Sequence, residues 1–170
     1  MSYTPNQNKK SAYACALAFF FCAFIALFAA PHSSVKIALQ LLCLGCATGG
    51  IFVLARYGLQ TFVYFLDDAQ SEENDLTVQR LQGKKRTTVC RLSFSLCVGL
   101  ERKDDQTDEK KYGKITSRHN YTASLTPASV YMLYFLEENE LRLILLECDD
   151  VFAAHIRRRL PPGAGGAGNE

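Results

Sequence analysis

The sequence predicts a membrane-embedded helical hairpin followed by a mainly-β domain of about seven antiparallel strands that ends in a helix. Ser11–Ala30 is a run of 20 residues without a charge, and Ile37–Ala55 is a second such run of 19. At a rise of about 1.5 Å per residue, each helix would reach about 30 Å, the hydrocarbon thickness of a bilayer. After Arg56 the pattern changes to short alternating apolar segments separated by turns, which is typical of β-strands.

The two apolar runs are expected to form a transmembrane hairpin over residues 11–56. The connection between them is so short that the second run can only return to the side from which the first one entered. Two alternatives are a soluble protein with two buried helices and a cleaved signal peptide over the first run. Uncharged runs of 18 or more residues are rare in soluble cores. The first run is also longer than the usual signal core of about 7–15 residues.

Charge is distributed unevenly along the chain. Residues 56–170 hold all 17 acidic residues and 16 of the 19 Lys and Arg residues, a formal charge of −1. This segment lacks the basic field of a nucleic-acid-binding protein. Lys9, Lys10 and Arg56 flank the hairpin, against Lys36 alone in its connection. The positive-inside tendency therefore predicts a cell-membrane protein with two spans and both termini in the cytosol.

Small residues recur every four positions in both apolar runs. The first run has Cys22, Ala26 and Ala30 at this spacing, and the second has Gly45 and Gly49. Such spacing lets two helix backbones approach closely, so these faces are expected to pack together within the hairpin. Contact with another protein and chance are the alternatives, since Ala and Gly are common in membrane helices.

The seven cysteines do not form a disulfide framework. They are odd in number and are Cys15, Cys22, Cys43, Cys46, Cys90, Cys97 and Cys148. Small buried thiols in a reduced compartment explain them better. Cys43 and Cys46 form a C-x-x-C pair, but a redox or metal role would need polar partners, and the run around them has no Asp, Glu or His.

The segment after the hairpin has the punctuation of a small β domain. Residues 1–10 are expected to be disordered, the domain to span residues 59–160, and residues 161–170 to form a flexible tail. Apolar alternation and turn residues predict strands at 61–66, 76–80, 86–92, 96–100, 120–124, 129–136 and 141–146. The polar segment 104–120 is expected to be a long loop.

A closing helix is predicted from about Asp149 to Leu160. Asp149 or Asp150 supplies the N-cap, and Phe152, Ile156 and Leu160 form an apolar stripe at four-residue spacing. Arg157–Arg159 lies at the end that favours cations. The two prolines that follow terminate the helix.

The order of these elements resembles that of bacterial pleckstrin-homology-like (PH-like) domains that follow transmembrane hairpins. The resemblance covers about residues 60–160 and is carried by the segments 64–68, 76–78, 83–86, 89–92 and 143–152. It implies a bent antiparallel barrel capped by a C-terminal helix, with functions in interaction and scaffolding. The loop after Leu66 departs from phosphoinositide-binding PH domains, because it is acidic where they carry Lys and Arg.

Basic residues instead gather at the next turn and strand. Lys84, Lys85, Arg86 and Arg91 are the candidates for contact with anionic lipid headgroups, and Arg157–Arg159 form a second basic cluster. A solvated turn and cations at a helix end are the alternative reading. The headgroup contacts would orient the domain rather than recruit it, since the hairpin already anchors it.

No catalytic, cofactor or metal site is predicted. His32, His119 and His155 lack further ligands at a repeating spacing, and adjacent Asp149 and Asp150 suit capping better than acid–base catalysis. Phosphate-binding glycine loops, nucleophile elbows and zinc-helix signatures are not found in the sequence.

The sequence therefore predicts a non-catalytic, membrane-anchored interaction or scaffold protein. Its expected partners are membrane lipids and another membrane or cytosolic protein, or a second copy of the chain. Neither a nucleic acid nor a small-molecule substrate is expected. The alternatives are a regulatory module that senses anionic lipids and a membrane redox protein that uses Cys43 and Cys46.

Overall fold

The computed structural model describes residues 1–6, 9–32, 35–66, 75–104 and 111–162. The predicted acidic loop after Leu66, part of the predicted 104–120 loop and most of the predicted tail lie outside the described residues. The helices are α1 (Lys9–Ala29), α2 (Lys36–Val53) and α3 (Asp150–Arg157). The strands are β1 (Ser2–Tyr3), β2 (Gln60–Leu66), β3 (Asp75–Gln82), β4 (Lys85–Ser93), β5 (Cys97–Arg102), β6 (Ile115–Asn120), β7 (Tyr131–Glu137) and β8 (Glu140–Leu146).

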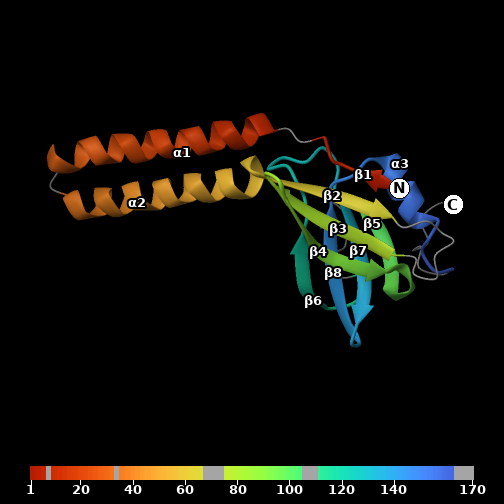
Figure 1. Ribbon diagram of the computed structural model, residues 1–170. Helices are drawn as coiled ribbons and strands as arrows, with labels where there is room; N and C mark the ends of the chain where they lie inside the picture. The colour runs from red at the N-terminus through yellow and green to blue at the C-terminus, as the bar shows by residue number, and fades with distance from the viewer. Residues whose placement is uncertain (7–8, 33–34, 67–74, 105–110, 163–170) are drawn as a thin grey trace. The chain divides into compact units, whose positions relative to one another are not determined.

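The chain divides into two compact units. One is the helical hairpin, Gln7–Gln60 with Ser124–Thr126, and the other, here called the β domain, holds the rest of the chain. In the hairpin, α1 and α2 lie side by side (Figure 1). Both helices are long and apolar enough to cross a membrane by length and composition. A π-helical turn, Leu54–Gly58, extends α2, and Leu59 alone separates it from β2.

The first sheet contains a strand that the sequence analysis missed. Its order is β1-β2-β3-β4, and β1 pairs antiparallel with β2 through Ser2↔Phe65 and Tyr3↔Tyr64. The prediction of disorder over residues 1–10 is therefore wrong at Ser2–Tyr3, and also at Lys9, where α1 begins. The physical reason is a tertiary contact. The Tyr3 ring stacks on Phe152 with ring centroids 4.8 Å apart. The polar sequence around Tyr3 does not indicate this contact, because its partner lies far away in the chain.

The second sheet has the order β5-β7-β8-β6. Strands β7 and β8 form an antiparallel hairpin, but β6 pairs parallel with β8. The predictions of seven antiparallel strands and of a barrel are wrong, because the described strands form two sheets of four strands that are not closed on each other. Strand β6 also lies within the predicted 104–120 loop rather than at 120–124. Its sequence, ITSRHN, has a single apolar residue and gives no strand signal.

The main core takes its side chains from both sheets and from α3. Its largest fully buried members are Tyr64, Leu66, Leu76, Phe94, Leu133, Ile144, Leu146, Phe152 and Ile156. The predicted closing helix is confirmed, with Phe152 and Ile156 buried and the Asp149 carboxylate accepting a hydrogen bond of 2.7 Å from the Phe152 nitrogen. A second cluster around Met132, Tyr134 and Leu143 makes β7 and β8 apolar on both faces.

The turn between β7 and β8 is strained at one position. Glu138 (φ 53°) and Asn139 (φ 65°) are both left-handed, as a two-residue type I′ turn requires. Asparagine tolerates this conformation, whereas glutamate does not favour it.

Glu138→Asn is expected to raise the free energy of unfolding of the β domain by about 0.5–1 kcal/mol, because it relieves a left-handed glutamate. The measurement is thermal unfolding of the full chain in mild detergent. Glu138→Gln is the matched control, since it removes the same charge without the conformational preference of asparagine. Equal stabilisation by both variants would assign the effect to charge instead.

Candidate functional site

The helix–helix contact of the hairpin is lined by alanine residues on α1 and the turn that follows it. Ala12, Ala16, Ala23, Ala26 and Ala30 are each at most 7% exposed. With the half-buried Phe19 they repeat at alternating intervals of four and three residues. This is the spacing of a left-handed coiled-coil seam, which lets two helices stay in contact along their length.

Some of the predicted packing residues lie in this seam, and others lie on the exposed surface of the helices. Ala26 and Ala30 lie in it, and a Cβ added at Gly49 would lie 3.2 Å from the Phe19 ring. Cys22 and Gly45 are exposed, and no side chain or neighbouring backbone lies within 4 Å of a Cβ added at Gly45. A strict four-residue spacing drifts around the helix, so it marked the wrong side of each helix at these two positions.

Gly50 is the close-approach residue that sequence reasoning missed. It is buried, and a Cβ there would lie 3.2 Å from both the Phe19 Cβ and the Phe20 ring. The sequence does indicate a close approach here through the adjacent glycines Gly49 and Gly50, but the four-residue spacing includes only Gly49. Cys43 and Cys46 are half-buried free thiols on the same helix. Among the described residues, no group of three potential ligands is placed to hold a metal ion.

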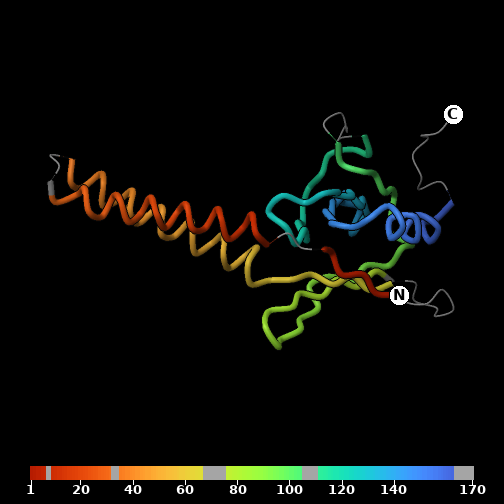
Figure 2. Tube along the Cα trace, turned by 90° about the horizontal axis from the view of Figure 1, so that it is seen from above, coloured from red at the N-terminus to blue at the C-terminus, as the bar shows by residue number. Residues whose placement is uncertain are grey.

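The four basic candidates lie on the β3–β4 hairpin, and all four are exposed. Gln82 pairs with Lys85, so Gly83 and Lys84 form a two-residue turn, and Gly83 has the positive φ (59°) that begins a type II′ turn. Figure 2 shows the hairpin projecting from the rest of the β domain, with β3 yellow-green and β4 green. The structure therefore places Lys84 and Lys85 at its tip and Arg91 nearer to the core.

Arg157, the first residue of the second basic cluster, belongs to a structural network that joins the start and end of α3 to the second sheet. The Arg157 guanidinium lies 5.8 Å from the centre of the Tyr131 ring, and the Tyr131 hydroxyl donates to the Asp150 carboxylate. Arg102 approaches the same carboxylate at 3.8 Å. These contacts tie α3 to the end of β5 and the beginning of β7, so Arg157 and Asp150 have structural partners.

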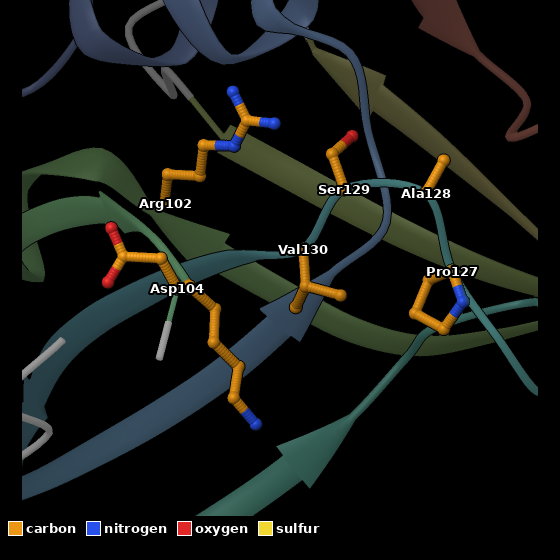
Figure 3. Close-up of a pocket in the computed structure, with 7 residues that line it drawn as sticks. Arg102, Asp104, Pro127, Ala128, Ser129 and Val130 are labelled. Carbon is orange, nitrogen blue, oxygen red and sulfur yellow. The ribbon is translucent and has the colours of Figure 1, made fainter. Parts of the chain in front are cut away.

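A cavity of about 590 Å³ opens beside the end of β5 (Figure 3). Figure 3 shows Arg102 and Asp104 on one side and the segment Pro127–Val130 on the other. The Ser129 hydroxyl donates to the Cys148 carbonyl at 2.6 Å, so it is not paired with a base that could activate it. Cationic and anionic groups both line the cavity, which favours no single class of ligand.

A buried polar network around Tyr64 was not predicted. Its hydroxyl donates to the Tyr121 carbonyl at 2.8 Å and accepts from the Glu147 nitrogen at 3.2 Å. The Glu147 carboxylate in turn accepts from the Ala123 nitrogen at 2.8 Å. Burial raises the pKa of Tyr64 far above its usual value, so the phenol stays neutral. The network holds the segment after β6 against β2 and β8, which is a structural role.

The histidines do not assemble into a site. His119 lies 3.1 Å from the Ser117 hydroxyl and stacks on Tyr121, and His155 is a half-buried residue of α3. The side chain of His32 lies outside the described residues. Neither of the described histidines belongs to a potential metal-ligand group in the part of the chain that the structure describes.

The thiols of the β domain are poor nucleophiles. Burial, the largest cause, raises the pKa of Cys97 to about 12 and that of Cys148 to about 12, from an ordinary value near 9. Because the folded-state pKa is raised, the neutral thiols contribute stability that is complete below about pH 9. That contribution is lost as the pH rises toward about 12.

We therefore expect Cys97 and Cys148 to resist alkylation at about pH 8 in the folded protein and to react after unfolding. The β domain should also lose stability between about pH 9 and 12. Mass spectrometry of alkylated peptides and thermal unfolding against pH measure the two effects. Replacing both Cys97 and Cys148 with alanine should reduce the loss of folding stability between about pH 9 and 12. An unchanged dependence of stability on pH would contradict this assignment.

Tyr112 covers the second apolar cluster on the outer side of β7 and β8. Its ring centre lies 4.6 Å from that of Tyr134, and its hydroxyl donates to Glu101 at 3.2 Å. Lys111 binds the same carboxylate at 2.6 Å. A Cβ added at Gly99 would overlap the Tyr112 hydroxyl, so glycine leaves the space that this tyrosine occupies.

Gly99→Ala is expected to cost about 1–3 kcal/mol of domain stability by displacing Tyr112. In a Tyr112→Ala background the same substitution should cost much less, because the overlapping ring is gone. Thermal unfolding of the four proteins of this cycle gives the coupling. Additive losses would show that Gly99 is needed for its backbone instead.

The chain matches no protein-family model, no curated protein and no solved structure.

Proposed function

We propose that the protein is a non-catalytic interaction or scaffold protein, anchored in the cell membrane by α1 and α2 and presenting the β domain at the cytosolic face. The observation that carries this proposal is the pairing of β1 with β2. One strand precedes the hairpin and the other follows it.

The pairing limits how the chain can cross a bilayer. Ser2↔Phe65 and Tyr3↔Tyr64 are backbone partners in one sheet, and the Tyr3 hydroxyl accepts from the Asp149 nitrogen at 3.1 Å. Both strands must therefore lie in the same aqueous phase, which supports two crossings rather than one. It also argues against cleavage after the first apolar run, because cleavage would remove Tyr3 from the β domain.

The surface of the hairpin supports insertion over burial in a soluble core. Large apolar side chains point away from the seam on both helices, among them Phe21 (63% exposed), Phe28 (62%), Leu44 (62%) and Phe52 (66%). A continuous apolar surface of this kind is unfavourable in water. Contact with lipid acyl chains accounts for it.

The PH-like relationship of the β domain is part of the proposal. Support comes from two mostly antiparallel sheets followed by a C-terminal helix whose Phe152 and Ile156 are buried. The parallel pairing of β6 with β8 departs from a simple meander. Binding is proposed over catalysis because the Ser129 hydroxyl in the cavity beside the end of β5 donates to a backbone carbonyl and is not activated as a nucleophile.

Topology mapping tests the proposal in the full chain. Tags at each end should both be protected from an external protease in sealed cells, and the protein should resist carbonate extraction. Tags on opposite sides of the membrane would overturn it. Crosslinking in the native membrane, followed by purification in detergent, should then recover a protein partner whose yield does not depend on lipid composition.

A second candidate function is a module that senses anionic lipids. It is favoured by the exposed basic residues of the β3–β4 hairpin. In this case the pose of the β domain would change with headgroup charge, while partner recovery would depend on the lipids present.

A further inference from the structure

We propose that one face of the β3–β4 hairpin, formed by Arg86, Thr88 and Arg91 and here called the arginine face, contacts the phosphates of anionic lipid headgroups, and that Lys85 does not belong to it. This inference rests on the proposed membrane anchoring. It assigns a ligand class to a surface that the sequence could not define.

The strand register defines the arginine face. Arg91 pairs with Thr77, Thr88 with Gln79 and Arg86 with Leu81. Alternate residues of β3 share a face, and paired residues of neighbouring strands point the same way, so these three residues of β4 lie together. The opposite face of the hairpin carries the buried Leu76 and Val78, which belong to the core.

A β-bulge in β4 creates this arrangement. Val78 pairs with Cys90 and the next residue, Gln79, pairs with Thr88, which leaves Val89 as the extra residue. In a regular strand Arg86 and Arg91 would lie on opposite faces, because they are five residues apart. The bulge brings them to the same face and sends Lys85, the partner of Gln82, to the other one.

The bulge is held by core contacts. Val89 packs against the main core, and the Tyr121 hydroxyl lies 3.4 Å from the Val89 carbonyl. Bulges often re-aim side chains at a strand edge, and β4 is the edge strand of its sheet. The side of β4 on which the two arginines lie is therefore determined by a bulge that packs on the folded core.

Phosphate groups arranged in a plane fit this surface. Guanidinium groups bind phosphate oxygens in pairs, which distinguishes them from lysine. Arg86 and Arg91 are four register steps apart on β3, about 13 Å, so together they reach more than one headgroup. Arg91 also has contacts within the protein, and we expect Arg86 to contribute more. Anchoring of the chain in the membrane by α1 and α2 makes such weak contacts effective, because it keeps the arginines close to the headgroups.

The test compares two adjacent threonines in the full chain. A photoreactive benzoylphenylalanine replaces Thr88 on the arginine face or Thr87 on the other face. Each protein is reconstituted in nanodiscs of phosphatidylcholine alone or of phosphatidylcholine and phosphatidylglycerol in equal parts. The yield of lipid adducts is measured by mass spectrometry. Position 88 is expected to give several-fold more adducts than position 87, mainly with phosphatidylglycerol.

Charge variants complete the test. Arg86→Gln should lower the adduct yield at position 88 several-fold, Arg91→Gln should lower it less, and Lys85→Gln should leave it unchanged. Equal yields at positions 87 and 88, an equal effect of Lys85→Gln, or capture of protein instead of lipid would overturn the inference while leaving the membrane anchoring intact. Release of the chain by carbonate would overturn the anchoring and the inference together.

Discussion

Replacing Phe152 with alanine is expected to lower the free energy of unfolding of the β domain by about 3–5 kcal/mol. Phe152 is 1% exposed and its ring lies 4.8 Å from Tyr3 and 6.1 Å from Tyr64, measured between ring centres. Helix α3 has eight residues, which is too short to be stable without tertiary packing. Loss of this ring should therefore loosen α3 and release β1, whose Tyr3 stacks on it.

The full chain in mild detergent is suitable for this measurement, because the micelle keeps the hairpin folded. Near-ultraviolet circular dichroism follows the tyrosines of the β domain, and hydrogen exchange follows the amides of β1. Val151→Ala is the matched control, since Val151 is 63% exposed on the same helix. Similar losses in the two variants, or unchanged protection of β1 in Phe152→Ala, would contradict the anchoring role of Phe152.

Gly50→Leu is expected to separate α1 from α2, whereas Gly45→Leu leaves them in contact. A Cβ added at position 50 would lie 3.2 Å from the Phe19 Cβ and from the Phe20 ring, whereas a Cβ added at position 45 has open space within 4 Å. Overpacking of this kind costs about 1–3 kcal/mol, and a leucine in a seam of alanines should reach the upper end. The two substitutions add the same apolar side chain to the same helix.

Spectroscopic labels at the loop end of each helix report the distance between the helices during titration with SDS. The Gly50→Leu protein should separate at a lower SDS fraction than the unchanged protein, and the Gly45→Leu protein should follow the latter. If position 45 were the more sensitive of the two, the four-residue spacing of Gly45 and Gly49 would define the contact after all.

The sequence predicts those elements whose apolar pattern is visible within the element itself. Two long uncharged runs predict the two apolar helices, and the stripe of Phe152 and Ile156 predicts α3. The long apolar segments of β7 and β8 also stand out, since both faces of these strands are buried. In α3, β7 and β8 the side chains that carry the signal are buried, whereas most of the large apolar side chains of α1 and α2 are exposed.

The missed elements depend on partners far away in the chain. Strand β1 has two residues and forms because it pairs with β2 and packs on Phe152. Strand β6 is polar and forms by pairing with β8. The same limit applies to the candidate site. Four basic residues could be named from the sequence, but only the register shift at Val89 shows that Arg86 and Arg91 share a face. A bulge depends on pairing, so alternation within a single strand does not reveal it.

The pairing of β1 with β2 also has a consequence for biosynthesis. The first strand leaves the ribosome long before its partner, and both apolar helices are made in between. In the two-span topology that we propose, the first sheet is completed only after the second helix has returned the chain to its starting side. Closing a loop from Tyr3 to Tyr64 makes this contact a late step. If only one of the two helices inserted, β1 and β2 would lie on opposite sides of the membrane. The edge of β2 would then stay bare and Phe152 would lack its stacking partner.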